Sequence, residues 1–215
     1  SFPINRERIL TDDGDFLDID WHKNNNKRLV ILSHGLEGNS RRPYVLGMAM
    51  HALSNKWDAL AWNYRGCSGV PNNLAASYHS GKTEDLSLII KHALTHKYQE
   101  IALIGFSIGG NKTLLHLGRE CSKIPKELIA SVALSVPCDL KSSSTHLAKC
   151  SHKIYMINFL KSFKEKLEEK EKIFPGKIDT KNFHKIKNFK QFDDRFTAPL
   201  NGFSSAEDYW YQSSS

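Results

Sequence analysis

The sequence predicts an α/β protein built on one mostly parallel sheet with helices on both faces. Runs of apolar residues, each of strand length, alternate with segments whose apolar positions recur at helical spacing. The strand-length runs are apolar throughout, which is typical of strands buried on both faces. A third observation is an apolar run that enters a helical segment directly through a serine flanked by glycines.

The chain opens with a predicted antiparallel hairpin. Residues 4–12 and 16–22 alternate between apolar and polar side chains, and Asp12-Asp13-Gly14-Asp15 between them has the composition of a turn.

Four parallel strands and three helices are then expected in alternation. The strands are predicted at residues 29–32, 59–64, 101–104 and 129–136, and the helices at residues 42–53, 83–94 and 111–121. Functional loops gather at the carboxyl ends of the strands in such a sheet. The regions around Leu36, Arg65, Ser107 and Asp139 should therefore converge on one edge.

The serine junction is the most informative motif. Ser107 follows the run 101–104 and precedes a helical segment, as in a nucleophile elbow, where the turn lifts the hydroxyl above the sheet. Side chains at Gly105 or Gly109 would collide with the turn, and Gly110 lets the helix pack close to the strand. The alternative is an ordinary serine in a tight turn.

The alternation stops after Asp139. Residues 141–212 are predicted to be largely helical and carry scattered aromatic residues. They could simply pack on one another, or they could form a lid that lines an apolar pocket. We therefore expect a core at 1–140 and a helical lid at 141–215, after the fourth parallel strand.

Composition favours a single globular domain. The chain has 215 residues, 40% of them hydrophobic, with a formal net charge of +7 and a pI near 9.2. Lysines concentrate at 161–172 and 177–190, and the glutamates among the first group predict a solvated helix face. We therefore expect no nucleic-acid partner.

The cysteines predict a reducing compartment. Cys67, Cys121, Cys138 and Cys150 show no short paired spacing and lie mostly in or beside apolar segments, as buried thiols do. No apolar run is long enough to span a bilayer, and no signal peptide is recognised. A soluble, cytoplasmic protein is expected.

Three residues near position 150 could be interpreted as metal ligands. His146, Cys150 and His152 lie close together, but their spacing matches no standard zinc pattern and no fourth ligand is evident. We expect no metal.

Several motifs together resemble the YheT-like branch of the α/β-hydrolases. They span 13–18 (DGDFLD), 34–38 (HGLEG), 63–69 (NYRGCSG), 78–85 (YHSGKTED), 105–111 (GFSIGGN), 192–199 (FDDRFTAP) and 202–209. The resemblance implies a carboxylesterase-like or lipase-like enzyme with a Ser-Asp-His triad. It would act on short-chain or lipid-like acyl esters without a cofactor.

The resemblance assigns three positions to the chemistry. Ser107 is the implied nucleophile, and the backbone N–H groups of Leu36 and Ile108 are the implied oxyanion hole.

It also assigns supporting roles. His34 is expected to shape the oxyanion loop by hydrogen bonding, and Arg65 and His79 to hold loops of the site.

The triad's acid and histidine have no match in the sequence. They follow the serine in the order Ser, Asp, His, whereas this chain ends at Ser213-Ser214-Ser215 directly after the lid. The last two strands of the fold are missing as well, which would leave an apolar edge exposed. We expect a truncated chain that is close to inactive by itself.

Replacement of the triad partners from within the chain is a further alternative. Asp139 could act as the acid, with His146, His152 or His184 as the base, but none of these histidines follows a final strand. Asp193 and Asp194 are expected to be structural.

Three functional hypotheses stay open at this point. The first is an ester hydrolase, active in its complete form through an acyl-enzyme on Ser107. The second is a catalytically silent fragment or binding protein that keeps the fold, and the third is acyl transfer on the same elbow. The expected partner is a small acyl ester. Contact with a membrane surface and the oligomeric state stay open.

Overall fold

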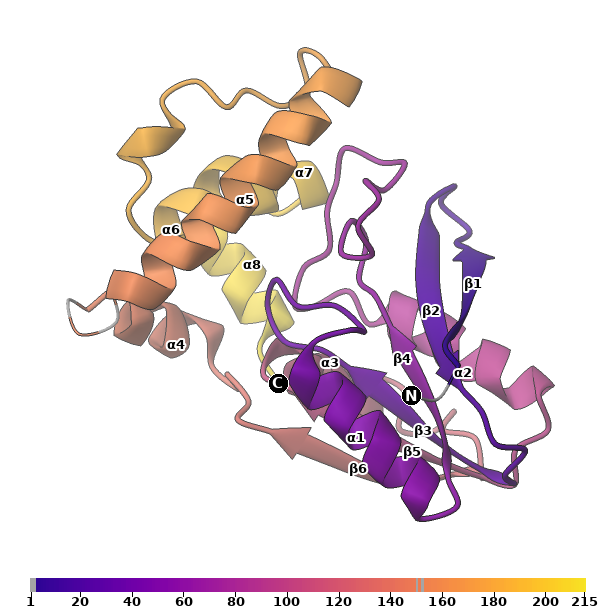
Figure 1. Ribbon diagram of the computed structural model, residues 1–215. Coiled ribbons are helices and arrows are strands. Elements are labelled where there is room, and N and C mark those ends of the chain that lie inside the picture. Colours follow the sequence, from indigo (N-terminus) through magenta and orange to yellow (C-terminus); the bar gives the residue numbers. More distant parts are fainter. Residues whose placement is uncertain (1–2, 150, 152) are drawn as a thin grey trace.

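The computed structural model describes residues 3–149, 151 and 153–215 and contains a six-stranded sheet in the order β1-β2-β4-β3-β5-β6 (Figure 1). The strands are β1 (Asn5–Leu10), β2 (Phe16–His22), β3 (Arg28–Ser33), β4 (Asp58–Trp62), β5 (Glu100–Phe106) and β6 (Leu128–Leu134). The β1–β2 and β2–β4 pairs are antiparallel, and the other pairs are parallel. The predicted hairpin and the mostly parallel sheet are both confirmed.

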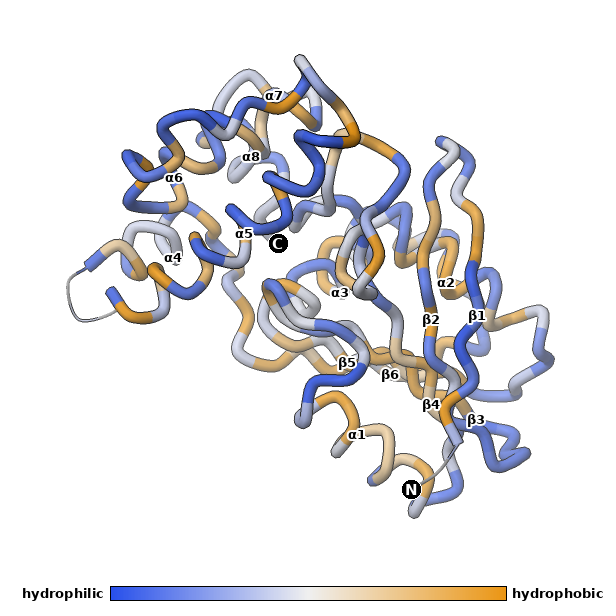
Figure 2. Tube along the Cα trace, turned by 45° about the horizontal axis from the view of Figure 1, so that its top comes forward, coloured by the Kyte–Doolittle hydropathy of each residue, from blue (hydrophilic) through white to orange (hydrophobic). Residues whose placement is uncertain are grey.

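Helices cover both faces of the central strands, as predicted. They are α1 (Pro43–Ser54), α2 (Glu84–Thr95) and α3 (Ile108–Arg119). Leu29 and Ile31 of β3 pack in one cluster with residues of α2 and α3, whereas Val30 and Leu32 pack in another with α1. This separation follows from the two-residue repeat of a strand, and Figure 2 shows apolar residues along the central strands and α1.

Strand β6 departs from the prediction of strands buried on both faces. Ile129 is 53% exposed and Val132 is 47% exposed, and β6 pairs on one side only, with β5, among the described residues. The apolar edge expected from the sequence is therefore present at β6.

The chain from residue 140 onward forms a second layer, which we call the helical layer. It contains α4 (Leu140–Leu147), α5 (Lys153–Ile173), the 3-10 turn η2 (Phe183–Lys185), α6 (Phe189–Phe192), the π-helical turn η3 (Asp193–Thr197), α7 (Ala198–Asn201) and α8 (Ala206–Ser213). Aromatic side chains such as Phe163, Phe183 and Phe192 give it an apolar core of its own. Figure 1 shows the layer on the opposite side of the molecule from the β1–β2 hairpin.

The prediction of a solvated lysine face on α5 is partly wrong. Lys164 is exposed and pairs with Glu168, but Lys170 is only 3% exposed. Its Nζ donates to the carbonyl oxygens of Leu74, Ala75 and Ala76 at 2.9–3.0 Å, and burial lowers its pKa to about 8. The flexible stem of a lysine lets its head group cross apolar surface to reach such acceptors.

The prediction of buried cysteines is also only partly confirmed. Cys67 is buried, and burial raises the pKa of its thiol to about 11, whereas Cys121 and Cys138 are exposed. Cys121 lies in a turn just beyond α3, and Cys138 lies in the loop after the edge strand β6. Cys150 lies outside the described residues.

None of the helices within the described ranges is both long and apolar enough to cross a membrane.

Candidate active site

Ser107 sits at the junction of β5 and α3 in a strained backbone conformation. Its φ is 54° and its ψ is −120°, and its N–H donates to Leu134 O at 2.8 Å. A Cβ atom at Gly105 would lie 2.3 Å from Gly109 O, and one at Gly109 would lie 2.4 Å from Ser33 O. Because these neighbours are backbone atoms, both positions require glycine, as the elbow prediction states.

Gly110 has the close-packing role expected of it. A Cβ atom there would lie 2.5 Å from Val136 Cγ2 and 3.1 Å from Gly105 O. The absence of a side chain lets α3 approach the loop after β6.

The two implied oxyanion donors lie beside the serine. Leu36 and Ile108 line one cavity with Ser107, and a Cβ atom at Gly35 would lie 3.4 Å from Ser107 Cβ. Ile108 is the first residue of α3, so its N–H has no acceptor inside the helix. Neither Leu36 N nor Ile108 N donates to another described residue. This arrangement leaves two backbone donors for an anion next to Ser107.

The loop that follows β3 and carries Leu36 is called the oxyanion loop below, after its implied role. His34 shapes this loop with both ring nitrogens. Nδ1 lies 2.8 Å from Gly35 O, and Nε2 accepts the N–H of Tyr64 at 3.3 Å. Burial lowers its pKa to about 3. A neutral imidazole whose nitrogens are both engaged has the structural role expected of it and cannot act as a base.

Arg65 joins three segments of the core below the cavity. Its guanidinium bonds Asp85 through two nitrogens, at 2.7 and 3.0 Å, and reaches Asp13 at 2.8 Å and Asp15 at 3.2 Å. Burial by itself lowers the pKa of Arg65, but these carboxylates outweigh burial and raise it. The contacts agree with its expected loop-holding role.

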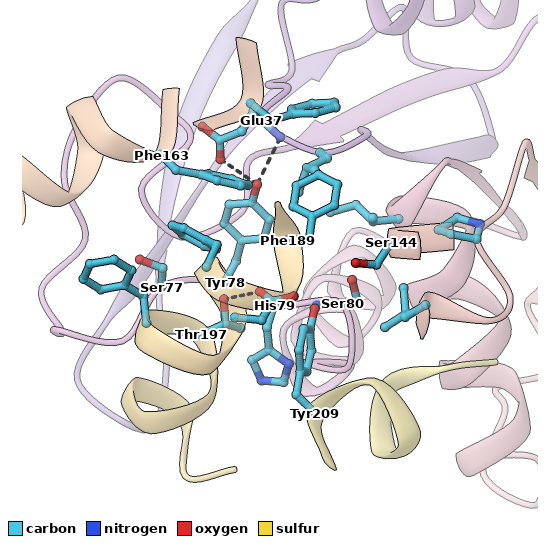
Figure 3. Close-up of a pocket in the computed structure, with 18 of the residues that line it drawn as sticks. Glu37, Ser77, Tyr78, His79, Ser80, Ser144, Phe163, Phe189, Thr197 and Tyr209 are labelled. Atoms are coloured by element: carbon cyan, nitrogen blue, oxygen red, sulfur yellow. Dashed lines mark hydrogen bonds between the residues drawn. The ribbon is translucent and has the colours of Figure 1, made fainter. Parts of the chain in front are cut away.

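His79 also holds a loop of the site. Its Nδ1 accepts the N–H of Gly81 at 3.2 Å, and its ring packs edge-on against Phe203 and Tyr209 of the helical layer. Burial, followed by the charge of Lys112, lowers its pKa well below the usual range. Figure 3 shows His79 beside Tyr209 at the cavity wall.

A cavity of about 650 Å³ separates the sheet from the helical layer. The loops carrying Leu36, Arg65 and Ser107 line it, which confirms their predicted convergence at one edge. Asp139 does not line it, although Pro137 and Leu140 on either side of it do. The opposite wall is aromatic and is formed by Phe159, Phe163, Phe189, Phe192 and Phe196 (Figure 3).

Glu37 connects the oxyanion loop to the helical layer, a role that sequence reasoning missed. It follows Leu36, has a φ of 54°, and is buried. Its carboxylate accepts hydrogen bonds from Lys166 Nζ at 3.0 Å, from Tyr78 OH at 2.7 Å and from Ser162 Oγ. Since Lys166 and Ser162 belong to α5, this side chain fastens α5 to the loop that carries Leu36 N–H.

The carboxylates considered as substitute acids all have structural contacts. Asp139 is exposed and caps α4 by accepting from Ser142 N at 3.0 Å. Asp194 accepts from Ala206 N at 2.7 Å and pairs with Lys190 at 2.8 Å. Asp139 therefore serves as a helix cap, and Asp194 is held by a backbone N–H group and an ion pair.

Asp193 is the buried carboxylate of the helical layer. It accepts from Thr197 Oγ1 at 2.6 Å and from Trp210 Nε1 at 2.8 Å. Burial raises its pKa to about 6, against the effect of these two hydrogen bonds. As predicted, its contacts are structural.

Among the described residues, no hydrogen bond joins His146 or His184 to Ser107. His146 lines the cavity and His184 is exposed outside it, while His152 lies outside the described residues. Within residues 3–149, 151 and 153–215, the Ser107 hydroxyl bonds no side chain. Cys150 is also outside this range, so the expectation that His146, Cys150 and His152 hold no metal stays a prediction.

A methyl group at Gly109 should destabilise the fold because it would collide with the backbone of Ser33. We expect the Gly109→Ala variant to lose about 2 kcal/mol or more in urea unfolding. Gly118→Ala is the matched control in the same helix, where a Cβ atom meets nothing within 4 Å. That variant should gain up to about 1 kcal/mol from helix propensity. Equal stability of the two variants would contradict the geometry of the elbow.

Loss of Lys166 should loosen α5 because it leaves the buried carboxylate of Glu37 without its cation. We expect Lys166→Met to lower stability by about 2 kcal/mol. Amide exchange should become faster in both α5 and residues 35–40. Lys164→Met removes an exposed pair on the same helix and should change stability by less than about 0.5 kcal/mol. Faster exchange confined to α5 would argue against a connection to the oxyanion loop.

Asp193 should make stability depend on pH. The pKa of Asp193 in the folded protein is about 6, which lies above the ordinary value of 3.8. The stability that the protonated carboxyl group contributes is therefore present below about pH 4 and is lost as pH rises through 6. The Asp193→Asn variant should therefore gain up to about 3 kcal/mol relative to wild type between pH 4 and pH 7. Urea unfolding at both pH values measures this difference.

Asp194→Asn is the control, because the pKa of Asp194 is shifted in the opposite direction to that of Asp193. Burial by itself raises the pKa of Asp194, but the hydrogen bond from Lys190 and that from Ala206 outweigh it and lower the pKa. The stability that Asp194 contributes is therefore already present above about pH 4, so this variant should change little relative to wild type between pH 4 and pH 7 and should recover relative to wild type only at lower pH. The same trend in both variants would show that Asp193 is not buried as described.

Comparisons with known proteins agree with the fold. The chain is 33% identical over 221 residues to the Escherichia coli (strain K12) protein described as "Putative esterase YheT", covering 97% of this chain and 63% of that protein. It is 28% identical to the mouse (Mus musculus) protein named phospholipase ABHD3, covering 97% and 53%. No protein-family model matches the chain.

A solved structure supports the same fold. The Pyrococcus furiosus esterase Pf2001 superposes with a TM-score of 0.59 at 25% identity, over 75% of this chain and 62% of that one. The present chain thus spans between half and two thirds of the length of these relatives. Its sheet, its elbow and these similarities show that it has an α/β-hydrolase-like fold, as its sequence motifs imply.

Proposed function

We propose that Ser107 is the nucleophile of a serine hydrolase that cleaves carboxylic esters. The observation that carries this proposal is the strained elbow, which holds Ser107 at the cavity next to two backbone N–H groups without acceptors. The names of the relatives, which include esterase and phospholipase, support ester substrates.

The reaction would proceed through an acyl-enzyme. Ser107 Oγ attacks the ester carbonyl carbon, and negative charge develops on the carbonyl oxygen. The N–H groups of Leu36 and Ile108 stabilise that charge, because they are fixed in place before the reaction starts. The alcohol then leaves, and water releases the acyl group from Ser107.

The cavity favours an uncharged acyl chain. Its aromatic wall offers apolar contact, and the two lysines that line it already have partners. Lys166 bonds Glu37 and Cys67 Sγ, and Lys170 bonds backbone carbonyls. An anionic substrate group placed there would have to displace one of these partners.

The helical layer is proposed as the lid of this site. Its aromatic residues form one wall of the cavity, and Glu37 fastens it to the oxyanion loop. We place the boundary between the core at 1–140 and the lid at 141–215, where the alternation of strands and helices ends. Held over a bound ester, this layer would exclude water from the attack.

Complete turnover also needs a proton acceptor. In this fold the acid and the histidine follow the serine in the order Ser, acid, His. Within the described residues no imidazole bonds Ser107. The proposal therefore makes full activity depend on a base that these residues do not bring to the serine.

A second candidate function follows from that same observation. Without a base, the cavity would bind acyl compounds through its aromatic wall and would not turn them over. Ser107 would then serve only as part of the binding surface.

Labelling with a fluorophosphonate probe distinguishes the two functions. If a base reaches Ser107, the chain should add one probe per molecule, detected as an increase over its mass of 24.4 kDa, and Ser107→Ala should add none. Ser143→Ala removes another cavity-lining serine and should label like wild type.

Labelling that persists in Ser107→Ala would overturn the assignment of the nucleophile. No labelling in the wild type, together with saturable binding of a fluorescent fatty-acid ester, would favour the binding function. A variant that fails to unfold cooperatively in urea would be replaced by Ser107→Gly, which also lacks the hydroxyl and tolerates the positive φ.

A further inference from the structure

Outside the cavity, α2 and β1 bring together three side chains whose chemistry is that of metal ligands. Glu7 of β1 faces His92 of α2 and His96, the C-cap residue that follows this helix, and one ligand atom from each lies within 4.8 Å of the others. The two histidines are four residues apart, so they lie one turn apart on the same side of the helix. Figure 1 shows α2 next to the β1–β2 hairpin, on the side of the molecule away from the helical layer.

Neighbouring contacts already orient the carboxylate. The indole N–H of Trp21 donates to Glu7 Oε2 at 2.8 Å, which leaves Oε1 3.1 Å from His92 Nε2. Such a bond to the far oxygen is the kind of support that fixes a metal ligand in place. The Trp21 ring also packs against both imidazoles, with centroids 6.2 Å from His92 and 4.7 Å from His96.

His92 has an unsatisfied nitrogen at this position. Its Nε2 is buried and makes no hydrogen bond of acceptable geometry among the described residues, although Glu7 Oε1 is close to it. A buried polar atom without a hydrogen bond is uncommon and calls for an explanation such as an ion.

We propose that Glu7, His92 and His96 form a binding site for a divalent transition-metal ion such as Zn²⁺. Two imidazoles and one carboxylate are a recognised zinc ligand set, in which water takes the fourth position. Ligand atoms on one zinc lie roughly 3–3.5 Å apart. Because His96 is exposed, rotation of its side chain can close the remaining gap.

Lys23 is a positively charged group beside the proposed site and opposes the binding of a cation there. Its Nζ lies 3.5 Å from His96 Nδ1 and 3.8 Å from the centroid of the Trp21 ring. Its positive charge repels a second cation, and its side chain must turn toward solvent when the metal binds. Removing that charge should strengthen binding, which is a consequence that no purely structural role of the cluster would produce.

A bound ion would fasten an edge strand to a helix. Strand β1 pairs only with β2 among the described residues, and most of its side chains are exposed. Cross-linking Glu7 to α2 would stabilise the hairpin by an amount set by the ion's affinity and concentration. None of the three ligands lines the cavity, so this site is independent of the proposed hydrolase function.

The test is Zn²⁺ binding by the whole 215-residue chain after treatment with a chelator, measured by competition with a chromophoric chelator. We expect one strongly bound ion per chain and a Zn²⁺-dependent rise in Tm. His92→Gln and His96→Gln should each weaken binding by at least about tenfold. Lys23→Met should strengthen it, and the exposed His51→Gln should leave it unchanged.

Co²⁺ distinguishes this site from the exposed thiols of Cys121 and Cys138. Bound at the proposed site, Co²⁺ should give visible bands without the charge-transfer absorption of a thiolate ligand. The proposal is overturned if binding is absent in wild type, if it survives in both histidine variants, or if thiolate absorption accompanies it. Circular dichroism of each variant confirms folding, and Lys23→Met tests the site without removing a ligand.

Discussion

The strained backbone of Ser107 is the constraint on which the rest of the site depends. A φ of 54° at a serine is unfavourable, and it persists because β5, α3 and the loop after β3 pack around it without side chains at Gly105 and Gly109. The same packing brings the loop of Leu36 against Ser107. The proposed nucleophile and its two proposed backbone donors therefore arise from one arrangement of main chain.

The helical layer depends on that arrangement through Glu37. This residue lies in the loop next to Leu36, and its carboxylate takes hydrogen bonds from two residues of α5. A buried carboxylate needs such partners, so α5 cannot move away without exposing it or leaving its charge unpaired. The position of the helical layer and the shape of the loop that carries Leu36 are thereby linked in a single set of contacts.

Much of the core could be predicted from the sequence because burial on both faces leaves a continuous apolar pattern. The runs containing Leu29 and Ile101 became β3 and β5, and the glycines around Ser107 marked the elbow. The role of His34 was also accessible, since it belongs to the loop that the elbow requires.

Contacts between distant charged side chains left no such pattern. Lys166 and Lys170 lie in a stretch rich in Lys and Glu, which resembles a solvated face, and only the tertiary structure shows which lysines turn inward. Glu7 and His92 are 85 positions apart, so their approach depends on how the hairpin docks on α2. The exposure of β6 and of Cys138 likewise depends on which strands have neighbours.

The most direct measurement is a crystal structure of the chain with an alkyl boronic acid bound in the cavity. The account predicts a covalent bond from Ser107 Oγ to boron, with one boronate oxygen about 2.7–3.1 Å from both Leu36 N and Ile108 N. The alkyl chain should lie against Phe163 and Phe189. A boronate bound to another residue, or one whose oxygens face away from both N–H groups, would contradict the account.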